Sequence, residues 1–168
     1  MASLQELRSV RLEKIEKLEH AGINPFPADV TSEETLKEVT ENFAERRTTS
    51  LVGRVMAIRG AGAIMFIVVN DGTAEFQAVL KKDDIDESAM NLFKETVDVG
   101  DFIWFSGELF VTKRGAESLL VKEWKMAGKS LLPLPDKHAG LQDKDEIYRK
   151  RYLDILTNPE SAQVFKTR

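Results

Sequence analysis

The most constraining feature of the sequence is the stretch 53–80, GRVMAIRGAGAIMFIVVNDGTAEFQAVL, in which two apolar runs are separated by the turn sequence NDGT. Successive side chains of a strand point to opposite faces of a sheet, so alternate residues share a face. NDGT is typical of a tight hairpin turn. The all-apolar sets, Met65, Ile67 and Val69 in the first run and Phe76, Ala78 and Leu80 in the second, are therefore predicted to fill a core.

The opposite face of this hairpin carries Phe66. It shares that face with Asn70 in its own run, and the outward set of the second run contains Glu75 and Gln77. These polar neighbours predict that Phe66 and Gln77 lie on the same outer surface of adjacent strands. The alternative is that Phe66 packs under the N-terminal helices, with Gln77 as an ordinary surface residue. Alternation by itself leaves both interpretations open.

Glycines and turn residues divide the middle of the chain into strands. The pattern predicts strands near 49–59, 63–70, 73–80, 102–112 and 117–126, with a helix within 83–97 between the third and the fourth. Five strands with a helix in that place are the plan of the OB-fold, a partly open barrel that binds oligonucleotides. The predicted class is α+β, mainly β, with a five-stranded OB-fold barrel. A five-stranded sandwich also fits the pattern.

The flanking segments are predicted to be helical. A helix over 3–21 begins at a capping box of Ser3 and Glu6 and ends at Gly22, and a second helix lies within 31–47, with Thr31 and Glu34 spaced as a capping box. After Lys129, prolines indicate an extended link and residues 143–156 a further helix. We therefore predict an N-terminal helical segment (1–47), a barrel domain (48–128) and a C-terminal linker segment (129–168).

Basic side chains recur every three residues along the first helix, at Arg8, Arg11, Lys14 and Lys17. Residues at this spacing lie close to one another on a helix surface. We interpret the row as a solvated face with ion pairs such as Glu13–Lys17. A row that contacts phosphates is the alternative.

Composition excludes several classes of protein. The chain has no cysteine, which excludes disulfides and thiolate metal sites, and its two histidines, His20 and His138, are too far apart in sequence to suggest a metal centre. The net charge of −4 argues against a protein that coats nucleic acid through charge alone. No signal peptide and no apolar run of membrane-spanning length are present, which suits a cytoplasmic protein.

The outward hairpin face has the chemistry of a base-binding site. An exposed ring such as Phe66 offers a surface on which a base stacks, worth about 1–3 kcal/mol per base. The amide of Gln77 offers a donor and an acceptor to the Watson–Crick edge of an unstacked base. Arg54 and Arg59, on or just after the first strand, are candidates to hold phosphates or a base edge.

Motifs along the whole chain resemble one family. The stretches RLEKIEKLEHAGINPFP, LVGRVMAIR, LKKDDI, VGDFIWFSGELFVTKRG, SLLPLPDK and YRKRYLDIL are similar to the N-terminal part of bacterial-type class II lysyl-tRNA synthetases. The tail is the most specific part of this resemblance. Aspartyl- and asparaginyl-type synthetases share the barrel and a similar anticodon-binding face, so they are the alternative within this group.

The resemblance implies an OB-fold that recognises the U-rich lysine anticodon, with the central uridine stacked on Phe66 and with Gln77 and Arg59 beside it. Two positions depart from the family pattern. Ala63 stands where the family usually has Lys, and Ala116 stands where it has Glu, with Glu117 one position later. A step of one residue reverses the facing of a strand side chain, so Glu117 can substitute only if the hairpin shifts register.

The resemblance also implies the partners of the chain. The parent enzyme is expected to be a homodimeric ligase that uses ATP and Mg²⁺ and charges a lysine tRNA, whose anticodon loop this chain binds. Its catalytic domain is expected to begin within 129–168 and to continue beyond Arg168, so this chain alone is expected to lack catalytic residues, cofactors and activity, and to be monomeric. A free-standing OB-fold protein that binds single strands, or an adaptor that docks through its apolar tail, are the competing hypotheses.

Overall fold

The computed structural model describes residues 3–32, 34–45, 47–60, 62–135 and 140–168. The chain forms two compact units that divide between Leu132 and Pro133. The segment boundaries predicted at residues 47 and 128 stay predictions.

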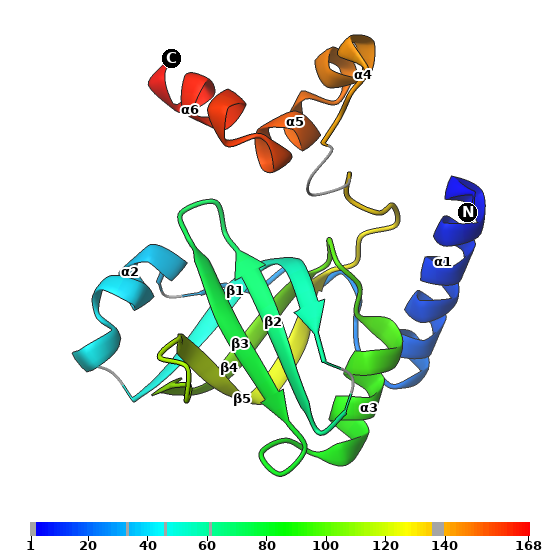
Figure 1. Ribbon diagram of the computed structural model, residues 1–168. Helices are drawn as coiled ribbons and strands as arrows, with labels where there is room; N and C mark the ends of the chain where they lie inside the picture. Colours follow the sequence, from blue (N-terminus) through cyan, green and yellow to red (C-terminus); the bar gives the residue numbers. More distant parts are fainter. Residues whose placement is uncertain (1–2, 33, 46, 61, 136–139) are drawn as a thin grey trace. The chain divides into compact units, whose positions relative to one another are not determined.

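Five strands in the first unit form one sheet that closes in a ring (Figure 1). The strands are β1 (Thr48–Arg59), β2 (Ile64–Asn70), β3 (Glu75–Lys81), β4 (Phe102–Val111) and β5 (Glu117–Gly128). Their order is β1-β2-β3-β5-β4, and β4 pairs back to β1. All pairs are antiparallel except β3 with β5, which pair in parallel over residues 77–79 and 118–120. Helix α3 (Glu87–Thr96) connects β3 to β4, as the OB-fold prediction required.

The interior of the ring is filled by the alternate residues that the sequence predicted. Met65, Ile67 and Val69 of β2 are at most 4% exposed, and the inward residues of β3 are equally buried. Phe93 of α3 covers one end of this core and packs edge-on against Trp124, with ring centroids 5.2 Å apart. The predicted facing of both hairpin strands is thus confirmed.

The second helix, α2 (Leu36–Glu41), begins later than predicted. Thr35, not Thr31, caps it, in a capping box with Glu38. The carboxylate of Asp71, in the β2–β3 turn, also accepts a hydrogen bond of 2.8 Å from the Leu36 amide. The prediction failed because the same spacing occurs twice within eight residues, and a long-range contact with the sheet selects the second.

The basic row on α1 (Leu4–His20) is a solvated face only in part, since Arg8 and Lys17 are exposed and Lys17 pairs with Glu95 at 3.2 Å. Our interpretation is corrected at Arg11 and Lys14. Arg11 is 8% exposed and donates to the carbonyls of Ser130, Leu132 and Val99 at 2.8–3.1 Å. Lys14 contacts Asp98 at 2.6 Å. The helix docks through these two cations because the connection between α3 and β4 and the segment after β5 present carbonyls and a carboxylate to it. The cations therefore bind protein groups of this unit.

A buried ionic cluster extends this docking site. Lys129 follows β5, and its fully buried Nζ lies 2.7 Å from the carboxylates of both Asp98 and Asp101. Asp101 is also fully buried and accepts hydrogen bonds from the backbone of Asp98 and Ser130. Burial alone would raise the pKa of Asp98, but hydrogen bonds from Lys129 and Lys14 outweigh it, so this pKa lies below its usual value.

The second unit consists of three short helices, α4 (Lys144–Arg149), α5 (Arg151–Thr157) and α6 (Pro159–Thr167). The single helix predicted over 143–156 is wrong, because the backbone leaves the helical region at Lys150 (φ −116°, ψ 47°). Helix α6 was not predicted, although Asn158 caps it and Pro159 occupies its first turn. None of the helices in the described ranges is both long and apolar enough to cross a membrane.

Replacing Lys129 by Met should lower the free energy of unfolding by about 3–5 kcal/mol, because it leaves the buried carboxylates of Asp98 and Asp101 without a cation. Urea unfolding followed by circular dichroism measures the change. Lys37→Met is the matched control, since Lys37 pairs with Glu41 on the surface with 64% of its side chain exposed. That change should cost about 0–1 kcal/mol. Equal losses in the two variants would contradict a structural role for the cluster.

Candidate nucleic-acid interface

A groove of about 760 Å³ lies on the outer surface of the closed sheet. The end of β1, the start of β2, the end of β3 and the β4–β5 hairpin line it. Its apolar residues are Ile64, Phe66, Val79, Phe110, Ala116 and Leu120, and its polar residues are Arg59, Gln77, Lys81, Asp84, Thr112, Lys113 and Arg114. The groove thus combines an apolar surface with a rim of mostly basic side chains.

The pairing of the strands places three predicted site residues in this groove. Arg59 of β1 is directly opposite Phe66 of β2, which is directly opposite Val79 of β3. Gln77 is two residues before Val79, so it lies diagonally from Phe66 on the same face. Phe66 is 36% exposed, whereas its neighbours in the strand, Met65 and Ile67, are buried. The outward position of Phe66, one of two alternatives from the sequence, is confirmed.

Gln77 is held in place by its neighbour on β5. Its Nε2 donates a hydrogen bond of 2.8 Å to the Ser118 hydroxyl, which donates in turn to the Ala116 carbonyl at 3.2 Å. Ser118 is fully buried. A side chain that is held by a hydrogen bond to a fixed, buried partner loses less freedom when it binds a ligand.

The hairpin between β4 and β5 supplies two cations that the sequence analysis did not single out, Lys113 and Arg114. The hairpin is closed by a hydrogen bond of 2.9 Å from the Thr112 amide to the Ala116 carbonyl. Gly115 adopts a positive φ of 82° at its tip. The sequence TKRG, with two basic residues just before a turn glycine, was the available signal.

One carboxylate lies among these cations. Asp84 contacts Lys122 at 2.8 Å and Lys81 at 3.4 Å. The hydrogen bond from Lys122 is the main reason that the pKa of Asp84 lies below its usual value. Asp84 is therefore ionised at neutral pH, and it offsets part of the charge of Lys81 at this end of the groove.

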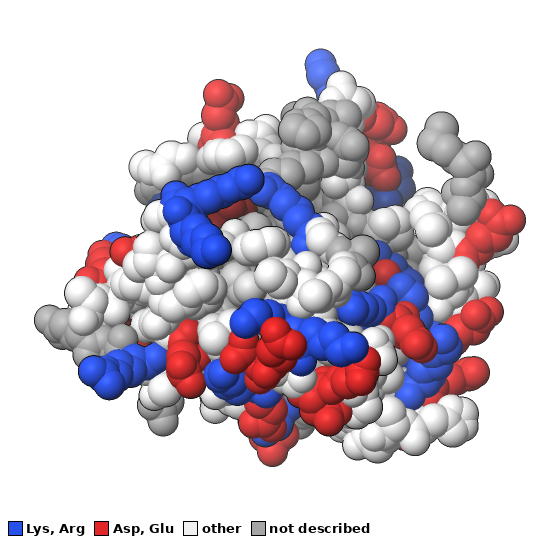
Figure 2. All heavy atoms as spheres, turned by 60° about the horizontal axis from the view of Figure 1, so that its bottom comes forward, with Lys and Arg blue, Asp and Glu red and all other residues white. Residues whose placement is uncertain are grey.

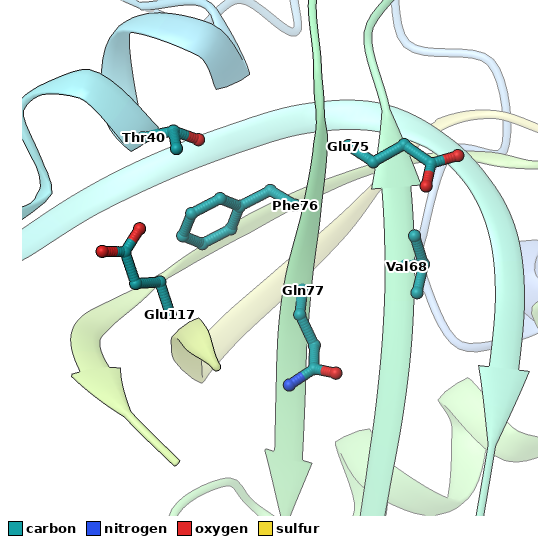
Figure 3. A pocket seen from close by; sticks show the side chains of 6 residues that line it. All are labelled: Thr40, Val68, Glu75, Phe76, Gln77 and Glu117. Carbon is teal, nitrogen blue, oxygen red and sulfur yellow. The ribbon is translucent and has the colours of Figure 1, made fainter. Parts of the chain in front are cut away.

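Glu117 does not join Phe66. It lines a neighbouring hollow of about 270 Å³ with Thr40, Phe76 and Glu75, and this hollow shares only Gln77 with the groove. Figure 3 shows Glu117 beside Phe76, with the Gln77 amide pointing away from both. Glu117 pairs with Val111 at the first position of β5, and the preceding Ala116 is the residue that lines the groove. The hairpin therefore has no register shift that brings a carboxylate to position 116.

Arg54 is also distant from the groove along β1. It is paired with Asn70, five residues from Arg59, a separation of about 16 Å at the usual rise of a strand. Its guanidinium lies over the Phe102 ring at 4.2 Å and donates to the Gly100 carbonyl. Burial lowers the pKa of Arg54. These contacts with protein groups account for its position, and its predicted part in binding stays a prediction.

Basic and acidic side chains alternate on the face shown in Figure 2, where the end of β3 and helix α3 come forward. A uniformly basic surface is therefore absent from the described part of that face. Over the residues that the structure describes, no group of His, Cys, Asp and Glu could hold a metal ion, and His138 lies outside them. The site is suited to binding through stacking and a few local charges.

Comparison with known families agrees with this geometry. Residues 49–127 match the family of OB-fold nucleic acid binding domains that is labelled tRNA anticodon. The match covers the closed sheet. Its matched range extends from β1 to β5, so the groove is part of the OB-fold domain.

The chain is also similar to proteins named lysine–tRNA ligase. It is 37% identical to the ligase of Thermotoga maritima over 98% of its own length, 36% identical to that of Dehalococcoides mccartyi over 96%, and 40% identical to that of Shouchella clausii over 98%. In each case it covers 34% of the relative. The chain thus spans about a third of the length of the curated relatives that it matches.

Replacing both Lys113 and Arg114 by Ala should weaken binding of a single-stranded RNA and reduce its dependence on salt. Each lost phosphate contact lowers the slope of log K against log salt concentration by about 0.7, so the pair should lower it by about 1.4. Titrations at several salt concentrations measure the slope. A variant with Ala at both Lys144 and Lys166, which belong to the second unit, makes the same change in net charge. A slope that falls equally in both would contradict a role for the hairpin.

Proposed function

We propose that the OB-fold domain binds the anticodon loop of a lysine tRNA and stacks one of its uridines on Phe66. The observation that carries this proposal is the groove itself, in which an exposed aromatic ring, the amide of Gln77 and the guanidinium of Arg59 lie together. The similarity to lysine–tRNA ligases supports the choice of tRNA.

The chemistry of the groove fits an unpaired loop better than a duplex. Bases in a loop are unstacked, so one of them can place its ring on Phe66 and its Watson–Crick edge near Gln77. Arg59, Lys113 and Arg114 are available to the flanking phosphates. Because the whole chain has a net charge of −4, these few local cations must supply the attraction.

The full-length protein in this proposal is a class II lysine–tRNA ligase. The domain acts there by positioning: it holds the anticodon while the acceptor end of the tRNA reaches a catalytic domain. ATP and Mg²⁺ belong to that catalytic domain, as do the contacts of a homodimer. The chain alone would then bind tRNA as a monomer without aminoacylating it.

The test is the change Phe66→Ala. Loss of one stacked base costs about 1–3 kcal/mol, so the Kd for a lysine anticodon stem-loop should rise about 5- to 150-fold. Fluorescence anisotropy at fixed salt measures it, and urea unfolding checks that stability changes little, since the ring is 36% exposed.

Phe26→Ala is the control, because Phe26 is 53% exposed and lies outside the groove. Its variant should bind as the unmodified chain does. Unchanged binding after Phe66→Ala, or equal losses from the two variants, would contradict the proposal. A cytidine-rich loop that binds as tightly as the uridine-rich one would favour a single-strand binding protein without sequence preference.

A further inference from the structure

Ser118 is fully buried, and its hydroxyl lies between the side-chain amide of Gln77 and the β4–β5 hairpin. Its oxygen accepts from Gln77 Nε2 at 2.8 Å, and its hydrogen goes to the Ala116 carbonyl, 3.2 Å away. The parallel pairing of β3 with β5 sets Gln77 directly beside Ser118. The pairing of the strands therefore fixes the position of the hydroxyl. Because Ser118 is fully buried, water cannot replace either hydrogen-bond partner unless the sheet opens locally.

This short chain of hydrogen bonds fixes which end of the amide points into the groove. A serine hydroxyl has a single hydrogen to donate. With Nε2 toward Ser118, both hydrogen bonds form. With the amide flipped, the hydroxyl must donate to Oε1 and leaves the Ala116 carbonyl, so one hydrogen bond is lost. One such bond biases the two orientations by up to about tenfold.

Figure 3 shows the result of this bias. The amide nitrogen of Gln77 lies on the side of Glu117 and β5, and the oxygen lies on the side of Val68 and β2. Strand β2 also carries Phe66, and both Phe66 and Gln77 line the groove. A base on the ring would thus meet the acceptor Oε1.

We propose that Ser118 is a positioning residue that makes the groove selective for uracil over cytosine, by holding the acceptor oxygen of Gln77 toward the stacked base. The proposal rests on the proposed function, since it requires a base on Phe66. Uracil and cytosine have rings of the same size, so stacking on Phe66 does not separate them. Uracil presents an N3–H donor to Oε1, whereas cytosine presents a lone pair at N3.

The mismatch gives selectivity because a buried polar group without its partner is costly. In a pose where Oε1 faces N3 of the base, uracil donates its N3–H to Oε1, and cytosine would need the amide to flip and offer Nε2 to N3. Ser118 opposes that flip through the hydrogen bond to Ala116. The same carbonyl accepts from Thr112 in the closed hairpin, so the hairpin that carries Lys113 and Arg114 also supports the amide.

The experiment compares two anticodon stem-loops that differ only in uridine or cytidine at the central anticodon position. The ratio of their Kd values is measured at fixed salt for the unmodified chain and for Ser118→Ala. The variant removes the bias, so the preference for uridine should fall by up to about tenfold, mainly through tighter binding of the cytidine loop. Ser106→Ala, a half-buried serine on β4 outside the groove, is the control and should keep the ratio.

If Ser118 had only a structural role, Ser118→Ala would weaken binding of both loops equally and leave the ratio of their Kd values unchanged. That result would overturn the proposal. Equal binding of the two loops by the unmodified chain would overturn it as well. If Phe66→Ala still raises both Kd values in that case, a base stacks on Phe66 and only the selectivity fails. Failure of the proposed function has a different signature, namely no effect of Phe66→Ala on either loop.

A second variant and a second measurement keep the proposal testable if Ser118→Ala is too unstable to fold. Ser118→Cys keeps a group of similar size with a weaker hydrogen bond, and its ratio should lie between those of the alanine variant and the unmodified chain. Nuclear magnetic resonance of the Gln77 side-chain amide in the free chain should show slowed hydrogen exchange that either change accelerates. Exchange that is already fast in the unmodified chain would overturn the proposal.

Discussion

The register between β2 and β3 is the constraint on which the rest of the molecule depends. It pairs Phe66 with Val79 and Ile67 with Ala78, so that one set of alternate residues is buried and the other forms the outer groove. A slip of one residue would send Met65, Ile67 and Val69 outward and Phe66 inward. Burial of the apolar set therefore fixes the position of the binding surface at the same time.

Charged groups attach the N-terminal helix to this sheet. Arg11 and Lys14 of α1 reach the connection between α3 and β4, where Lys129 is buried between Asp98 and Asp101. Leu4 and Leu7 of the same helix remain 62% and 38% exposed. Leu18 of this helix is nevertheless fully buried in the core, so apolar and charged contacts both hold the helix. The interpretation of the basic row as a solvated face was wrong at Arg11 and Lys14. The reason is that the receiving surface offers carbonyls and carboxylates, which the sequence of the helix does not reveal.

The part of the candidate site that depends on which face of a strand each side chain occupies was predictable from the sequence. The shared face of Phe66 and Gln77 follows from the polar neighbours on adjacent strands, whereas Arg59 follows from the family resemblance. The structure brings all three into one groove. Glu117 and Arg54 lie elsewhere, because Ala116 occupies the groove position of the hairpin and Arg54 contacts Phe102. Lys113 and Arg114 join the groove because β5 returns beside β3, a pairing between strands that are distant in sequence.

The sequence by itself determined the strands, the inward and outward sets of the β2–β3 hairpin and the Ser3 cap of α1, because each depends on residues close together in the chain. It also determined the family resemblance. Only the tertiary structure decided which cations surround Phe66, which side chains of α1 contact the rest of the unit, and which way the Gln77 amide points. These features depend on the closing of the sheet, which brings Ser118 to Gln77 across 41 residues, and no local pattern encodes such a contact.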